Sequence, residues 1–478
     1  MLSADAYASH DALGLAALVA AGETTPDDLL TLALARVAAV NPRINAVFHL
    51  VEAEARQAIA QGLPKGPFAG VPMLIKDLNA HVTGWPLTNG SRLYDGFVCD
   101  HDSTLVARLR AAGFVLFGRT TSPEFGITST TENQVHGITR NPYDLSRTSG
   151  GSSGGASAAV AAGIIPLAHA SDGGGSIRIP AAACHLFGLK PSRARNTMGP
   201  DAGEGWGGMS TVHAVGHSVR DAAALLDVTS PFVHGDPYVA PAPARYYLSE
   251  VGAPVGRLRI ALCLEAMNPT PLEAPALEAV DFMAGLLRRL GHDIIEVKRL
   301  PVDGPALSAA QRSIISASLA RTVAQRLAAI HRASAADLLE PVTGFMAEGG
   351  HIEPATAYLD GIAAIHLAGR QMARFYDEGD YDFILSPLLP EAPPPIGLLS
   401  LSPADLDVFV AAIGRYSAYT GLQNMTGQPA MSIPCGLDAQ GLPRAVQFAG
   451  RLGDEAGLLR LAAQLETEAP WAQVRPSL

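Results

Sequence analysis

The 478-residue chain is 48% hydrophobic and 17% charged, and this composition excludes a disordered protein because so many hydrophobic residues can bury a large core. The formal net charge of −11 at pH 7, without any run rich in Lys or Arg, argues against direct binding to nucleic acid.

The predicted elements alternate between helices and strands along the chain. A helix begins at Thr25, whose hydroxyl can cap the first turn, and Pro26 follows at a position where helices favour proline. Buried strands are predicted from apolar runs at 69–77, 113–120, 257–265 and 381–390. Further helices are predicted at 277–291 and 457–468. This alternation predicts an α/β fold in which helices cover both faces of a sheet.

The N-terminal sequence and the cysteines favour a cytoplasmic protein. Asp5 and Asp11 stand where a signal peptide requires positive charge, and no window reaches the apolar length of a membrane span. The four cysteines lie far apart, which is typical of a reducing compartment and excludes a thiolate metal site. His213 and His217 have a spacing found in zinc sites, but no glutamate lies between them, so we predict no metal.

Lys76 stands out among the four lysines of the chain because it alone ends an apolar run, "GVPMLIK". An ammonium group can lose its proton when it is desolvated, whereas a guanidinium stays protonated. Lys76 is therefore a candidate general base. The alternative is a lysine at a strand end that extends its charged group to water.

Two glycine-rich stretches follow, "SGGSSGGAS" at 149–157 and "SDGGGSIRIP" at 171–180. The first contains the pattern G-x-S-x-G, which in α/β-hydrolases places a nucleophilic serine on a strand-to-helix turn and would make Ser152 the nucleophile. The residues before it, "NPYDLSRT", are a poor strand, and this context argues against that reading. A phosphate-binding loop is also disfavoured, because Ala156 follows the last glycine instead of Lys.

Three blocks in this order closely resemble the amidase signature family of serine hydrolases: "GVPMLIKD", "GGSSGGASAAVAAG" and "SDGGGSIRIPAAACHLFGLKPS". Ser176 follows Ser152 by 24 residues, which is the family's spacing between its two catalytic serines. The resemblance extends to "GHSVRD" and to "QNMTGQPAMSIPCGLDAQGLPRAVQFAG" near the C-terminus. It implies one amidase signature domain over residues 1–478, an α/β fold with a large twisted mixed β-sheet covered by helices on both faces. It also implies a catalytic core at about 65–220 and a more variable helical pocket region at about 305–375.

The resemblance implies a catalytic triad of Lys76, Ser152 and Ser176. Ser176 matches the nucleophile, Ser152 the serine whose peptide bond from Gly151 is cis, and Lys76 the base. In this scheme Lys76 accepts the proton of Ser152, and Ser152 accepts the proton of Ser176. The deprotonated Ser176 then attacks the carbonyl. Lys76 later returns the proton through Ser152 to the leaving amine.

The second glycine-rich stretch resembles the family's oxyanion hole, in which backbone N–H groups bind the oxygen of the tetrahedral intermediate. The implied donors are Gly173, Gly174, Gly175 and Ser176. The chain departs from the family at Gly173, where Ile, Thr or Ala is more common. An added glycine either loosens the hole or opens space above it.

Other positions are implied to support the site or to shape the substrate pocket. The supporting positions are Gly151, Ser153, Asp172 and Arg178. Trp206 and Met209, in the loop "GEGWGGMS", are predicted to shape the pocket. The alternative for Trp206 is a loop residue that anchors itself on the core.

The layout is most similar to the bacterial branch that includes nylon cyclic-dimer hydrolases and aryl acylamidases, near which carbamate-cleaving members occur. We therefore expect an amidase that hydrolyses small to medium amides through an acyl-enzyme on Ser176, without a cofactor. A urethanase, an aryl acylamidase or an esterase with the same triad is the alternative. A partner-dependent amidotransferase subunit and a non-enzymatic binding module are further alternatives. The expected partner is a small-molecule amide or carbamate, with no nucleic acid and no membrane, and the chain is expected to be a monomer or a homodimer.

Overall fold

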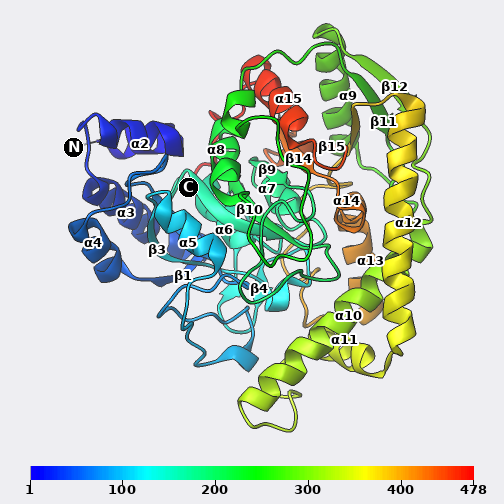
Figure 1. Ribbon diagram of the computed structural model, residues 1–478, viewed down its shortest axis with the longest axis horizontal. Helices are drawn as coiled ribbons and strands as arrows, with labels where there is room; N and C mark the ends of the chain where they lie inside the picture. Colours follow the sequence, from blue (N-terminus) through cyan, green and yellow to red (C-terminus); the bar gives the residue numbers. More distant parts are fainter. Residues whose placement is uncertain (1) are drawn as a thin grey trace.

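A computed structural model describes residues 2–478 and shows a fold built around an eight-stranded mixed sheet (Figure 1). In spatial order its strands are β12 (Asp293–Val297), β11 (Arg259–Cys263), β13 (Phe383–Pro387), β15 (Pro443–Gly450), β14 (Ala430–Leu437), β9 (Phe187–Lys190), β10 (Thr211–Gly216) and β8 (Leu167–Asp172). β11 pairs in parallel with β12 and β13, and the other neighbours are antiparallel. The predicted strands at 257–265 and 381–390 are thus confirmed as β11 and β13.

A second, three-stranded sheet brings the candidate base beside β8. Its order is β1 (Val47–Leu50), β3 (Val115–Thr120) and β2 (Pro72–Lys76), which confirms the two predicted N-terminal strands. All five residues of β2 are buried. The backbone N–H of Lys76 donates to Nδ1 of His169 on β8 at 3.2 Å, so the end of β2 is tied to β8.

Apolar side chains alternate between the two faces of the large sheet. Ile260 and Leu262 of β11 join a hydrophobic cluster with α9 (Ala274–Arg289) and α15 (Glu455–Glu468), both of which were predicted. Ala261 and Cys263, the neighbouring β11 residues on the other face, join a different cluster with α10 (Gly304–Ala329) and α12 (Ala355–Gly379). Because successive side chains of a strand point to opposite faces, both faces are covered by helices, as predicted.

The other helices surround the sheets, and those of the N-terminal part lie together on the left in Figure 1. Thr25 caps α3 as predicted: its hydroxyl accepts the N–H of Asp28 at 3.1 Å, and Pro26 opens the helix. The helices are α1 (Ala4–Ser9), α2 (Ala12–Ala20), α3 (Pro26–Ile44), α4 (Glu52–Gln61), α5 (Thr104–Ala111), α6 (Gly154–Ala161), α7 (Arg178–Ala183), α8 (Val219–Thr229), α13 (Leu406–Tyr416) and α14 (Gly421–Thr426). Short 3-10 helices and two-stranded ribbons complete the set: η1 (Arg92–Tyr94), η2 (Glu124–Gly126), η3 (Tyr247–Glu250), β4 (Glu132–Asn133), β5 (Gly137–Ile138), β6 (Arg140–Asn141) and β7 (Asp144–Thr148).

Three helices form the region at 305–375: α10 (Gly304–Ala329), α11 (Pro341–Ile352) and α12 (Ala355–Gly379). α12 runs along the right side of Figure 1, and α10 extends toward its lower edge. Residues of α10 and α12 reach the cavity described below. No helix within residues 2–478 combines the length and the apolar character needed to cross a membrane.

Candidate active site

A cavity of about 690 Å³ opens beside the two glycine-rich loops. Ser152, Ser176 and Gly173 line it together with the loop at 197–212 and one side of α10. Lys76 does not line the cavity, because its side chain is fully buried behind the serines. The fold therefore brings together all three predicted triad positions, from β2 and from the loops that precede α6 and α7.

Lys76 is surrounded by hydroxyl groups. Its Nζ donates to Ser152 Oγ at 2.7 Å, to Ser153 Oγ at 2.9 Å and to Ser171 Oγ at 3.0 Å. Burial lowers the pKa of Lys76 to about 7, and the charge of Asp172 opposes this shift only in part. A large share of Lys76 is therefore neutral near pH 7, and a neutral amine has a lone pair that can accept the proton of Ser152.

The two candidate serines lie on adjoining loops. The peptide bond between Gly151 and Ser152 is cis, as the resemblance implied. Only glycine fits at 151, since an added Cβ would lie 2.2 Å from the backbone oxygen of Thr130. The N–H of Ser153 donates to the carbonyl of Ser176 at 3.3 Å and joins the loops. No hydrogen bond joins the hydroxyls of Ser152 and Ser176 within the described part of the chain, and both residues line the cavity.

The turn before Ser176 provides backbone donors, but fewer than predicted. The N–H of Gly175 donates to Oδ1 of Asp172 at 2.7 Å and is therefore not available to an oxyanion. Across residues 2–478, the N–H groups of Gly173, Gly174 and Ser176 donate to no other protein atom. Three of the four predicted donors thus have no protein acceptor, whereas the Asp172 carboxylate accepts the N–H of the fourth, Gly175.

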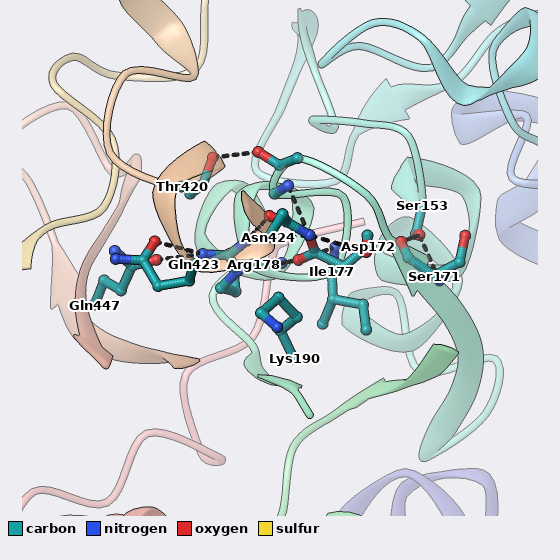
Figure 2. Close-up of polar contacts among 12 residues, drawn as sticks. Ser153, Ser171, Asp172, Ile177, Arg178, Lys190, Thr420, Gln423, Asn424 and Gln447 are labelled. Carbon is teal, nitrogen blue, oxygen red and sulfur yellow. Dashed lines mark hydrogen bonds and ion pairs between the residues drawn. The ribbon is translucent and has the colours of Figure 1, made fainter. Parts of the chain in front are cut away.

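A buried ion pair between Asp172 and Arg178 holds this turn in place (Figure 2). Nε and Nη2 of Arg178 contact the two carboxylate oxygens, each at 3.0 Å, and the carboxylate also accepts the N–H of Ile177 at 3.1 Å. The remaining guanidinium contacts are with the amide oxygens of Gln423, Asn424 and Gln447. Burial alone would raise the pKa of Asp172, but the charge and hydrogen bonds of Arg178 outweigh it and hold the pKa below its ordinary value. Removing one partner of such a buried pair costs about 3–5 kcal/mol, so both predicted supporting residues lie where they can fix the turn.

Comparison with known proteins agrees with this geometry. The sequence profile of the family described as Amidase matches residues 28–459. The chain belongs to the amidase signature family. It is therefore an enzyme that hydrolyses the C–N bond of amides.

This amidase has similar relatives along its whole length. It is 36% identical over 481 residues to the 6-aminohexanoate-cyclic-dimer hydrolase of Paenarthrobacter ureafaciens, and the match covers 98% of this chain and 97% of that relative. A solved structure of 6-aminohexanoate cyclic dimer hydrolase matches with a TM-score of 0.92 at 35% identity. The match covers 98% of this chain and 99% of the chain in that structure. A bacterial aryl acylamidase of the amidase signature family has a TM-score of 0.86 at 28% identity over 97% of both chains.

The loop at 204–210 explains the unusual glycine of this amidase. An added Cβ at Gly173 would lie 2.6 Å from Cε3 of Trp206, so the indole ring occupies the space that a side chain at 173 would fill. Trp206 lines the cavity, as predicted for a pocket residue. Met209 differs from its prediction: it is buried in the core cluster formed with α10, α12 and α14 and does not line the cavity. The loop turns between these two residues, with the N–H of Met209 donating to the carbonyl of Trp206 at 3.1 Å. Trp206 also packs against the core cluster that contains Met209, so it lines the cavity and anchors the loop on the core.

We expect Gly173→Ala to lower kcat/KM for an amide substrate by about 10²–10³-fold, the usual effect of misplacing an oxyanion donor. The added methyl group would force the turn or the Trp206 ring to move. Steady-state kinetics measure the loss, and far-UV circular dichroism checks the fold. The control is Gly173→Ala in a Trp206→Ala background, where the two closest contacts are gone and only Ser210 Oγ remains, at 3.0 Å, so the substitution should cost much less. An equal loss in both backgrounds would show that contact with Trp206 is not the reason for glycine at 173.

Several residues of the site were not predicted from the sequence. Ser171 contacts Lys76, Thr420 Oγ1 donates to the carbonyl of Gly174 at 2.6 Å, and Nδ2 of Asn424 donates to the backbone oxygen of Asp172 at 3.0 Å. Strand alternation could have found Ser171, since it lies two residues after His169 on β8 and both side chains contact Lys76. Thr420 and Asn424 had no such local signal.

Proposed function

We propose that this amidase hydrolyses small to medium amides with an apolar acyl or aryl portion, through an acyl-enzyme on Ser176. The observation that carries the proposal is the buried Lys76, whose Nζ lies 2.7 Å from Ser152 Oγ, with Ser152 and Ser176 facing one cavity. This arrangement supplies a base, a relay and a nucleophile without a histidine.

The proposed reaction uses the residues in a fixed order. Neutral Lys76 accepts the proton of Ser152 as Ser152 accepts that of Ser176, and Ser176 Oγ attacks the amide carbonyl. The N–H groups of the 173–176 turn that remain available donate to the developing oxyanion, and each such donor contributes about 2.7–4 kcal/mol in the transition state. Lys76 returns the proton through Ser152 to the leaving amine, and water then hydrolyses the ester on Ser176 by the same relay.

The cavity supports a substrate of moderate size with an apolar part. A volume of about 690 Å³ falls in the usual range of ligand pockets, about 300–1,000 Å³. Its large apolar and aromatic lining residues include Leu78, Tyr94, Phe125, Trp206 and Tyr358. The names of the relatives give a cyclic dimer of 6-aminohexanoate and aryl acylamides as their substrates, and both are amides with substantial apolar portions.

A matched pair of substrates tests the proposal: an aryl anilide and the corresponding aryl carbamate, with Ser176→Ala as the control. Preference of the purified chain for the anilide, lost in Ser176→Ala, would support it. Faster cleavage of the carbamate would assign the chain as a urethanase instead. If neither substrate is cleaved by the chain alone, and hydrolysis requires added protein subunits, the amidotransferase alternative replaces the proposal.

We also propose that residues 1–478 act as one catalytic unit in the cytoplasm. Groups from both halves of the chain meet at Asp172, and Nη2 of Arg475 near the C-terminus donates to the carbonyl of Ala8 at 3.2 Å. All four cysteines are buried and free, which supports a reducing compartment.

A further inference from the structure

Three side chains from separate segments converge at the edge of the cavity: His81, His101 and Asp201. Nδ1 of His81 lies 3.2 Å from Nε2 of His101, and Nε2 of His101 lies 3.0 Å from Oδ1 of Asp201. The third side of the triangle, from Nδ1 of His81 to Oδ1 of Asp201, is 3.4 Å. His81 and Asp201 also line the cavity that contains Ser152 and Ser176.

These distances match the edges of a tetrahedral zinc site. Zinc lies about 2.0–2.1 Å from histidine nitrogens and about 2.0–2.2 Å from carboxylate oxygens, and a tetrahedron of that size has edges of about 3.3–3.5 Å. All three edges of the cluster are within a few tenths of an ångström of that range. The spacing of the three ligand atoms is thus that required for one shared ion.

The orientation of His101 fits a ligand role. Its Nδ1 lies 2.7 Å from Oδ1 of Asp100, so an N–H at Nδ1 donates to that carboxylate and leaves the lone pair of Nε2 directed at the cluster. A carboxylate that binds the second nitrogen of a metal-bound histidine selects the tautomer and increases the basicity of the ligand.

Backbone hydrogen bonds hold the three segments together. The N–H of Ser103, the N-cap of α5, donates to the carbonyl of His81 at 3.0 Å. The next N–H, of Thr104, donates to the carbonyl of Gly199 at 3.0 Å, two residues before Asp201. The N-terminus of α5 therefore positions the loops that carry all three ligands.

We propose that His81, His101 and Asp201 form a binding site for a divalent transition-metal ion, zinc by ligand type, at the edge of the active-site cavity. Two imidazoles and one carboxylate leave the fourth tetrahedral position open to water or to an anionic group, such as a carboxylate of a bound substrate. The site goes beyond the proposed hydrolysis, because metal binding is measured directly and does not depend on any step at Ser176.

Zinc binding to the full-length, metal-stripped protein tests the proposal. Competition with a chromophoric chelator gives the dissociation constant, and elemental analysis gives the stoichiometry. We expect one zinc ion to bind tightly per chain. His101→Gln or Asp201→Asn should weaken this binding at least about 10–100-fold, and Asp100→Asn should weaken it by altering the carboxylate contact with Nδ1 of His101. The matched control is His366→Gln, which removes an exposed histidine of α12 outside the cluster and should leave this binding unchanged.

Cobalt binding to the unaltered protein gives an independent result if a variant fails to fold. Tetrahedral Co²⁺ with nitrogen and oxygen ligands should produce visible absorption that one equivalent of Zn²⁺ removes. The proposal is overturned if no stoichiometric metal binds, or if the cluster variants bind as tightly as the unaltered chain. In that case the three side chains form a hydrogen-bonded group in which His101 bridges Asp100 and Asp201.

Discussion

Ser176→Ala abolishes amide hydrolysis, with an expected loss of kcat on the order of 10⁶-fold, the scale seen when a serine hydrolase loses its nucleophile. It also abolishes covalent labelling by a fluorophosphonate, because Ser176 Oγ is the proposed nucleophile. The fold should survive, since Ser176 Oγ makes no hydrogen bond to another protein atom within the described residues. Steady-state kinetics on an anilide, intact-mass spectrometry after labelling and thermal denaturation measure these three results.

A matched control for this substitution is Ser318→Ala. Ser318 lies on α10 and lines the same cavity, but its hydroxyl donates to the carbonyl of Ile314 at 2.7 Å. Labelling and turnover should persist in this variant. Labelling that persists in Ser176→Ala and maps to Ser152 would instead support the nucleophile-elbow reading of the first glycine-rich stretch.

Lys76→Met is expected to lower kcat/KM by at least about 10²–10⁴-fold, the usual contribution of a general base. In the unaltered enzyme only neutral Lys76 can accept a proton. Since burial lowers its pKa to about 7, activity should be low in acid, rise with pH through about 7 and then level off. Lys76→Arg should be inactive across this range, because a guanidinium stays protonated. The pH dependence of kcat/KM reports the titrating groups of the free enzyme, so it measures this rise of activity near pH 7.

The control for the pH profile is Lys190, the second fully buried lysine. Burial and the charge of Arg178 lower its pKa to about 7 as well, but its Nζ donates to the carbonyl of Pro191 at 2.7 Å and, within residues 2–478, makes no hydrogen bond to a serine. Lys190→Met should therefore retain the rise of kcat/KM near pH 7. If the rise of kcat/KM near pH 7 is lost in Lys190→Met and remains in Lys76→Met, Lys76 is not the base. Full activity of Lys76→Met, with dependence on a histidine, would contradict the assigned mechanism.

The strands, the capped helix and the triad positions could be predicted from the sequence because their signals are local. A buried strand has a run of apolar residues, and the cap of α3 needs only Thr25 and Asp28, three residues apart. The triad positions followed from three compact motifs. The core position of Met209 and the contact of the Gly175 N–H with Asp172 could not be predicted, because a motif gives the identity of a residue but not the direction of its side chain or its N–H.

The amino-acid sequence alone identified the candidate catalytic residues: one lysine at the end of an apolar strand and two serines 24 residues apart in glycine-rich loops. The tertiary structure decided how many N–H groups face the cavity, which ring covers Gly173 and which distant residues meet. Asn424 contacts Asp172 although the two are 252 residues apart in the sequence, and Asp201 contacts His101 although they are 100 residues apart. Such contacts depend on how the sheet and its loops pack in space, and no short sequence window contains that information.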